Sequence, residues 1–154
     1  MHHDRTFGFA TRALHAGTPP DSATGARAVP IYQTAAYVFG STEQAAELFA
    51  LRSYGHIYSR ISNPTVAAFE ERAASLEGGL GAIAFSSGLA AQLCTVLSLA
   101  QVGDHIVSSQ SVYGGTVTQF SITLKRMGIE TTFVPVDDLD AIRKAIQPNT
   151  KMLF

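Results

Sequence analysis

The sequence predicts an α/β protein in which an N-terminal extended arm precedes the first part of a mostly parallel α/β/α sheet domain. Two observations lead to this prediction. Residues 1–40 contain Pro19, Pro20 and Pro30 and lack both helical and strand periodicity, which favours an extended segment. Beyond this arm and the helices that follow it, short apolar runs of strand length alternate with longer runs at helical spacing. Alternation of this kind is typical of a parallel sheet covered by helices on both faces.

A short helix is predicted directly after the arm. Ser41 and Gln44 fit a capping box ahead of an apolar run, so we expect a helix that ends near Leu51. The polar segment Arg52–Ser62 follows it as a loop.

A longer helix is predicted from Asn63–Pro64 to Glu77. The Asn63 side chain can accept a hydrogen bond from a free backbone amide, and proline at the first helical position loses no needed donor. Gly78 supplies the left-handed stop. The apolar residues recur at helical spacing and form one side of this helix. They are Val66, Phe69, Ala73 and Leu76.

The remaining elements alternate between strands and helices. The expected strands are Ala82–Phe85, His105–Ser108, Ile129–Val136 and a strand that starts at Met152, and the expected helices are Gly88–Ala100, Gly115–Met127 and Leu139–Ile146. In such a sheet, ligands gather at the carboxyl ends of the strands. The single cysteine, Cys94, lies in an apolar run and is interpreted as a small buried hydrophobe.

Composition excludes several classes of function. Acidic and basic residues nearly cancel, with a formal net charge of -1, and no basic cluster is present, so we expect neither nucleic acid nor a membrane surface as a partner. No apolar stretch approaches the roughly 20 residues that span a bilayer. No secretory signal precedes the arm, which favours a cytoplasmic protein. No metal site is expected.

The turn Ser86–Ala91 joins a predicted strand to a predicted helix and can hold a phosphate. Glycine at Gly88 lets a ligand approach the backbone, Ser87 can donate a hydroxyl, and the first amides of the helix, including that of Leu89, point outward. The alternative is that serine and glycine serve only the geometry of the turn.

The loop before the long helix has a second anion-binding pattern. Arg60 can hold phosphate oxygens with its planar guanidinium group, and Tyr58 can add a hydroxyl donor. The alternative is a solvated arginine beside a packed tyrosine.

Tyr113 follows the strand that ends near Ser108, so it is expected at the same sheet edge as Gly88. Its ring could stack on a planar cofactor, and its hydroxyl could transfer protons, which makes it the candidate catalytic residue. The alternative is a core tyrosine in a glycine-rich turn.

Three motifs together resemble the pyridoxal 5′-phosphate (PLP)-dependent Cys/Met metabolism (transsulfuration) family. They are Tyr58-Ser-Arg60-x-x-Asn63-Pro64-Thr65, Ser87-Gly88-Leu89-Ala90-Ala91 and Tyr113-Gly114-Gly115-Thr116. The resemblance covers nearly the whole chain. It implies the aspartate aminotransferase-like fold (fold type I), with residues 1–62 as the arm, short helix and cofactor-reaching loop and residues 63–154 as the first part of the large PLP-binding domain.

The resemblance also implies roles for individual residues. Ser87, Gly88 and Leu89 would hold the PLP phosphate of their own subunit, and Tyr113 would stack on the pyridine ring. Tyr58 and Arg60 would reach the PLP phosphate of a neighbouring subunit, so the active site would require a homodimer, and paired dimers are usual in the family.

Within the family, the segments Thr24–Thr34 and Glu47–Leu51 are most similar to O-acetylhomoserine sulfhydrylases. The implied reaction converts O-acetyl-L-homoserine and sulfide to L-homocysteine and acetate. Cystathionine γ-synthases and γ-lyases commonly have an arginine shortly after the Tyr-Gly-Gly-Thr motif, where this chain has Val117 and Thr118. They remain the alternative reading, and a non-catalytic phosphate-binding module is a third.

The family's Schiff-base lysine, in a Ser-x-Thr-Lys context, and the aspartate that pairs with the pyridinium nitrogen are not found in this sequence. Lys125, Lys144 and Lys151 are interpreted as surface or edge residues. Because the last predicted strand has only begun at Phe154, we expect the chain to be the N-terminal part of a longer enzyme.

Overall fold

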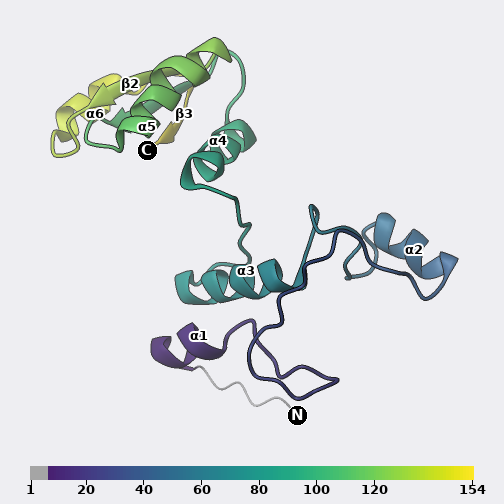
Figure 1. Ribbon diagram of the computed structural model, residues 1–154. Coiled ribbons are helices and arrows are strands. Elements are labelled where there is room, and N and C mark those ends of the chain that lie inside the picture. Colours follow the sequence, from purple (N-terminus) through teal and green to yellow (C-terminus); the bar gives the residue numbers. More distant parts are fainter. Residues whose placement is uncertain (1–6) are drawn as a thin grey trace. The chain divides into compact units, whose positions relative to one another are not determined.

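The computed structural model describes residues 7–154, which form two compact units. One unit ends at Ala84 and the other comprises Phe85–Phe154. Figure 1 shows the elements of each unit along the chain.

The first unit contains three helices, α1 (Phe9–His15), α2 (Thr42–Phe49) and α3 (Pro64–Glu77). The prediction of a wholly extended arm is wrong at α1, which lies beside α3 in Figure 1. Isolated helices of seven residues are not stable in water, so α1 depends on its contacts with α3. Those contacts are tertiary, and no periodicity in the sequence indicates them.

The caps of α2 and α3 agree with the sequence. The Ser41 side chain accepts a hydrogen bond from the Gln44 amide at 3.1 Å, and the Gln44 side chain accepts one from the Gly40 amide at 2.6 Å. The Asn63 side chain accepts from the Thr65 amide at 2.9 Å, and Gly78 ends α3 with φ of 69°. The bounds of α3 are therefore those predicted.

The contacts of α3 do not follow its predicted apolar side. Val66 and Phe69 are exposed, whereas Ala68 and Ala74 are buried. Two hydrogen bonds connect α3 with α1 and its C-cap: Arg72 donates through Nε to the Ala16 carbonyl at 3.0 Å, and the Arg12 guanidinium donates to the Ser75 carbonyl.

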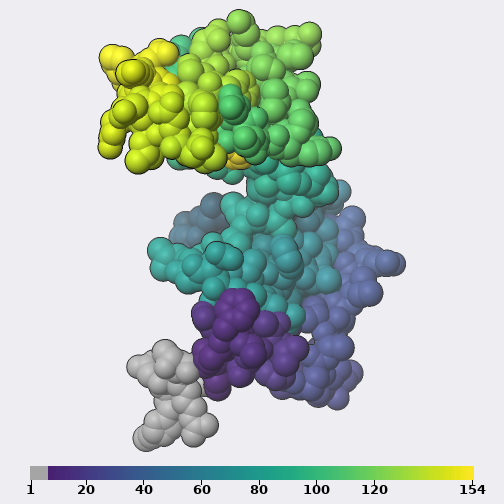
Figure 2. Space-filling model, turned by 90° about the vertical axis from the view of Figure 1, so that its left-hand side faces the viewer, coloured from purple at the N-terminus to yellow at the C-terminus, as the bar shows by residue number. Residues whose placement is uncertain are grey.

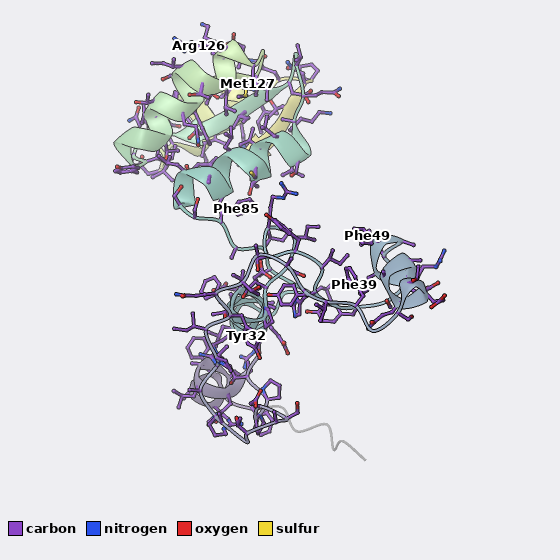
Figure 3. The ribbon with its side chains drawn as sticks, turned by 45° about the vertical axis from the view of Figure 1, so that its right-hand side comes forward. Tyr32, Phe39, Phe49, Phe85, Arg126 and Met127 are labelled. Carbon is purple, nitrogen blue, oxygen red and sulfur yellow. The ribbon has the colours of Figure 1, made fainter. Side chains whose placement is uncertain are left out.

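Phe49, the last residue of α2, forms an aromatic pair with Phe39. The rings of Phe39 and Phe49 lie 5.9 Å apart between centroids and point toward each other in Figure 3. Phe49 remains 64% exposed, so this pair is open to solvent in the chain.

The second unit is a three-stranded parallel sheet with helices on both faces, as predicted. The strands are β1 (His105–Ser109), β2 (Glu130–Val134) and β3 (Thr150–Leu153), in the order β2-β1-β3. The helices are α4 (Gly88–Leu99), α5 (Gly114–Thr118) with the π-helical turn η1 (Gln119–Leu124), and α6 (Leu139–Ala145). The helices α5 and α6 are visible at the surface of this unit in Figure 2, in green and yellow-green.

The core of this unit lies between one face of the sheet and the helices α4 and η1. Ile106, Phe120 and Leu124 are completely buried, and Val96 of α4 is 1% exposed. Ile142 of α6 covers the opposite face. The central strand β1 buries Ile106 on one face and Val107 on the other, which is the pattern expected of a parallel strand, whereas β2 and β3 are only partly buried.

Both ring nitrogens of His105 form hydrogen bonds to the neighbouring strands. Its Nδ1 lies 2.8 Å from the Thr150 hydroxyl of β3, and its Nε2 lies 2.9 Å from the Thr132 hydroxyl of β2. The ring is 2% exposed, so this buried polar group is satisfied by hydroxyls from both neighbouring strands.

Two local expectations are wrong. Ala82–Phe85 is not a strand, because a strand needs a partner and none pairs with this segment in the described part of the chain. Cys94 is exposed, because it lies on a side of α4 that nothing in its unit covers. The predicted helix Gly115–Met127 is confirmed by α5 and η1, and its second part is a π-helical turn.

Residues 7–154 contain no helix long and apolar enough to cross a bilayer. The same residues contain no group of three or more histidine, cysteine, aspartate or glutamate side chains placed to bind a metal ion.

Candidate functional site

The first turn of α4 presents free backbone donors. The Ser87 side chain caps the helix by accepting a hydrogen bond from the Ala90 amide at 3.1 Å. The amides of Gly88 and Leu89 precede the first intrahelical bonds, and the positive end of the helix dipole lies there. Gly88 is exposed, and a Cβ atom at this position would meet nothing within 4 Å. The turn is therefore open to an anion the size of phosphate.

Tyr113 lies near Leu89 of this turn, although no described strand precedes the turn to place it at a shared sheet edge. It is the residue before α5 and is 75% exposed. A Cβ atom at Gly115 would lie 2.6 Å from Cε1 of the Tyr113 ring and 3.2 Å from Cδ1 of Leu89. Only glycine permits this packing, in which the Tyr113 ring approaches α4 across Gly115.

Two side-chain hydrogen bonds connect α4 to α5 and η1. The Thr116 hydroxyl donates to Oε1 of Gln92 at 2.9 Å, and Nε2 of Gln119 donates to the Leu89 carbonyl at 2.9 Å. Thr116 is 1% exposed, so its bond to Gln92 is shielded from water. We call Thr116, Gln92 and Gln119 the interhelical clamp.

Tyr58 and Arg60 lie together in the first unit. The Arg60 guanidinium carbon is 5.2 Å from the centroid of the Tyr58 ring. Both side chains are exposed, and the described residues include no carboxylate paired with Arg60. Arg60 is therefore available to an anion.

The loop that carries this pair is fixed by its neighbours. Tyr58 forms an antiparallel bridge with Ala36, and the Ser59 amide donates to the Ala35 carbonyl at 2.8 Å. The Asn63 amide group donates to the Tyr32 carbonyl and to the Ser59 hydroxyl, each at 2.9 Å. Asn63 thus caps α3 and also holds the loop against the arm.

The structure accordingly places the predicted residues in two groups. Ser87, Gly88, Leu89 and Tyr113 meet at one end of the second unit, and Tyr58 and Arg60 meet in the first. The interhelical clamp and the second role of Asn63 were missed by the sequence reasoning. The spacing of Thr116 and Gln119, three residues apart on one helix after Tyr113, is the only signal in the sequence that points to the clamp.

The three lysines lie away from this end of the sheet. Lys125 pairs at 3.9 Å with Glu130, the first residue of β2, and Lys151 follows the Thr150 that pairs with the first residue of β1. Lys144 is exposed near the end of α6. Tyr113 instead follows the carboxyl end of β1, so none of the lysines is placed to reach it within this unit.

These features define a class of protein. A family model for the Cys/Met metabolism PLP-dependent enzymes matches residues 10–154, and the chain belongs to this family. The resemblance found in the three motifs is thereby confirmed.

Individual relatives are more specific. The chain is 54% identical over 149 residues to O-acetyl-L-homoserine sulfhydrylase of Corynebacterium glutamicum, covering 96% of this chain and 34% of the relative. It is 57% identical over 125 residues to O-acetyl-L-homoserine sulfhydrylase 1 of Thermus thermophilus, covering 81% of this chain and 30% of the relative.

A solved structure shares the fold. The O-acetylhomoserine (thiol)-lyase of Campylobacter jejuni matches with a TM-score of 0.91 and 44% identity, over 97% of this chain and 36% of that one. That crystal structure contains a pyridoxyl-lysine phosphate. The chain therefore spans about a third of the length of the relatives it matches.

The residues present fit part of this cofactor. Helix-terminal amides and the serines before them suit a phosphate, and an exposed aromatic ring beside them suits a pyridine ring. The described residues at this end include no lysine for the cofactor aldehyde, in agreement with the sequence.

Proposed function

We propose that the complete protein containing this chain is an O-acetylhomoserine sulfhydrylase that binds PLP at the α4 terminus. The γ-replacement breaks the Cγ–O bond of O-acetyl-L-homoserine, releases acetate and forms a Cγ–S bond with sulfide, giving L-homocysteine. The observation that carries the proposal is that the Tyr113 ring and the Leu89 side chain both lie next to Gly115, at the first turn of α4. It joins a phosphate-binding turn to a ring-stacking side chain in one site.

Different residues bind different parts of PLP. The amides of Gly88 and Leu89 and the hydroxyl of Ser87 hold the phosphate. The Tyr113 ring fixes the plane of the pyridine ring by stacking. Tyr58 and Arg60 bind the phosphate of a neighbouring subunit's PLP with charge-assisted hydrogen bonds, and their exposure in this chain supports this role.

Bound PLP supplies an electron sink for the carbanion chemistry of the substrate. The chain's own contribution is orientation, together with proton transfer, for which we assign the Tyr113 hydroxyl the role of assisting the departure of acetate. Because the ring is 75% exposed in this chain, the hydroxyl is open to a substrate placed above it.

The neighbours of Tyr113 favour sulfide over a larger amino-acid partner. Val117 and Thr118 occupy the stretch where cystathionine enzymes commonly have an arginine for a distal carboxylate. Without that arginine, a substrate with a second carboxylate leaves its charge unpaired, which costs affinity. The cystathionine γ-synthase or γ-lyase reaction is the second candidate.

The complete protein is proposed to be a homodimer with shared active sites, arranged as a tetramer, in the cytoplasm. The exposed Tyr58–Arg60 pair supports the shared site, because its anion is not supplied by the described residues of its own unit.

The test measures acetate release by the complete protein from O-acetyl-L-homoserine with sulfide, with cysteine and without a thiol. The proposal predicts rapid release with sulfide, together with a visible absorbance band from bound PLP. Faster release with cysteine than with sulfide would favour the cystathionine enzymes. PLP binding without any acetate release would favour a non-catalytic phosphate-binding module.

Two substitutions of Tyr113 separate its ring from its hydroxyl. Tyr113→Phe keeps the ring, so we expect unchanged affinity for PLP and a kcat lowered about 100-fold or more. Tyr113→Ala also removes the stack and is expected to raise the Kd for PLP about threefold to tenfold. An unchanged kcat in Tyr113→Phe would limit Tyr113 to stacking.

A further inference from the structure

We infer that Thr116 and Gln119 are positioning residues for the cofactor site, because their hydrogen bonds to α4 fix the Tyr113 ring relative to the phosphate-binding turn. This inference rests on the proposed function and adds two residues to it. Neither residue needs to touch the cofactor. Each acts through the helix that it connects.

Both clamp bonds end near the N-terminus of α4. Gln119 donates to the carbonyl of Leu89, whose amide belongs to the phosphate-binding turn. Thr116 donates to Gln92, one helical turn further along α4. Both anchors lie within the first two turns of α4, so the two bonds fix the end of the helix that presents its amides.

The clamp is also connected directly to Tyr113. Thr116 is three residues after Tyr113, and its amide donates to the Tyr113 carbonyl at 2.8 Å. A shift of α5 relative to α4 would therefore carry the tyrosine with it. A Cβ atom at Gly115 would lie 3.2 Å from Leu89, so the glycine backbone of α5 lies close to α4 at this point.

A π-helical turn begins at Gln119, directly after α5. A π turn holds one more residue than an α turn, and such turns are frequent at functional sites. Here it lets Phe120 and Leu124 remain completely buried while Gln119 is directed to α4. The Leu89 carbonyl can already accept a backbone hydrogen bond within α4. The bond from Gln119 is therefore an additional one that core packing alone does not require.

The experiment removes each bond while keeping the shape of the side chain, in the complete protein. The variants are Thr116→Val and Gln119→Met, with Thr116→Ser as the conservative variant that keeps the hydroxyl. Ser121→Ala is the matched control, because the Ser121 hydroxyl bonds only to the Val117 carbonyl of its own helix, at 2.7 Å. The measurements are the Kd for PLP and the visible circular dichroism of the bound cofactor.

Loss of either bond is expected to raise the Kd for PLP about threefold to tenfold and to reduce the dichroism of the visible band. Thr116→Ser and Ser121→Ala are expected to retain the wild-type values. In a Tyr113→Ala background, Thr116→Val and Gln119→Met are expected to change the Kd no further, because the positioned ring is gone.

A purely structural role gives a different pattern. It lowers the melting temperature of Thr116→Val and Gln119→Met but leaves the Kd and the dichroism unchanged, or it weakens PLP equally with and without Tyr113. Either pattern overturns the inference while the proposed function stands. Failure of the wild-type protein to bind PLP would instead remove the proposed function itself.

Discussion

The unit that ends at Ala84 and the unit that begins at Phe85 are stabilised in different ways. Phe85–Phe154 completely buries large side chains such as Ile106, Phe120 and Leu124 between a sheet and helices. The described residues of the first unit bury Leu48 and the small side chains Ala68 and Ala74, and leave Phe69 64% exposed.

Polar contacts replace packing in the first unit. Arginine side chains from α1 and α3 donate to backbone carbonyls, and Asn63 and Thr65 bond to the arm. Such bonds set local conformation but add little net stability each. The amides and ring of the proposed phosphate site are therefore held by a packed core, whereas Tyr58 and Arg60 are held by a network of directional hydrogen bonds.

The largest effect is expected from the core of the second unit. Phe120→Ala should lower the free energy of unfolding of the complete protein by about 3–5 kcal/mol, because it leaves a cavity between η1 and the sheet. Phe49→Ala in the first unit should cost no more than about 1.5 kcal/mol, since it loses mainly its pairing with Phe39. Urea denaturation measures both. Equal losses of stability would show that α2 is as tightly packed as the sheet, and that the two units are not stabilised in different ways.

The next largest effect is expected at Gly17, where the backbone lies close to α3. Gly17 has φ of 69°, and a Cβ atom there would lie 2.5 Å from the Ala68 carbonyl oxygen of α3. Gly17→Ala should therefore cost about 2–3 kcal/mol of stability, from the left-handed backbone and the contact together.

Gly25 is the matched control for this substitution. It has φ of 71° but open space around the Cβ position. Gly25→Ala should therefore lower stability by only about 1 kcal/mol, the cost of a left-handed backbone for alanine. Thermal unfolding of the two variants gives the difference. Equal melting temperatures would show that α1 and α3 separate freely to accommodate the new methyl group.

A smaller effect concerns the exposed arginine of the first unit. Arg60→Lys should raise the Kd of the complete protein for PLP about tenfold, because lysine cannot reproduce the planar fork. Arg52→Lys is the control, since Arg52 pairs with Glu47 at 2.8 Å and is assigned no ligand. Equilibrium dialysis with PLP distinguishes them, and equal affinities would leave Arg60 without a role in phosphate binding.

The smallest effect is expected from the Glu47–Arg52 pair itself. The hydrogen bond from Arg52 lowers the pKa of Glu47, so the pair stabilises the folded chain above the ordinary pKa of the carboxyl group and this contribution is lost as pH falls through the lowered pKa. Glu47→Gln should shift the urea midpoint slightly at neutral pH and not at all in acid. A shift that persists in acid would contradict this sign.

The elements predicted correctly are those whose signals are local. Asn63 and Gly78 define α3 from within the chain, and the apolar run of β1 needs no partner to be recognised. The parallel direction of the strands followed from the alternation of strands and helices, whereas their order in the sheet was not predicted. The helix α1 was missed because its bonds come from Arg72, far along the chain, and Ala82–Phe85 failed because a strand depends on its neighbours.

The candidate site was predictable to a similar extent. Tyr113 and the first turn of α4 both lie next to Gly115, as the sequence predicted, but the predicted reason fails, because no strand at Ala82–Phe85 brings the turn to the edge of the sheet. The clamp was not predicted, because Gln92, Thr116 and Gln119 are ordinary polar residues until the fold brings them together. Exposure of Cys94 likewise depends on what covers α4, which this stretch of sequence does not encode.

The order of the strands has a consequence for synthesis. β1 lies in the middle of the sheet, yet both of its neighbours follow it in the chain, and β3 comes last. During translation, β1 therefore leaves the ribosome with both hydrogen-bonding edges unpaired, and the two ring nitrogens of His105 must bond to water until Thr132 and Thr150 arrive. A pause in translation between β2 and β3 would prolong the time during which one edge of the central strand is free to join another nascent chain.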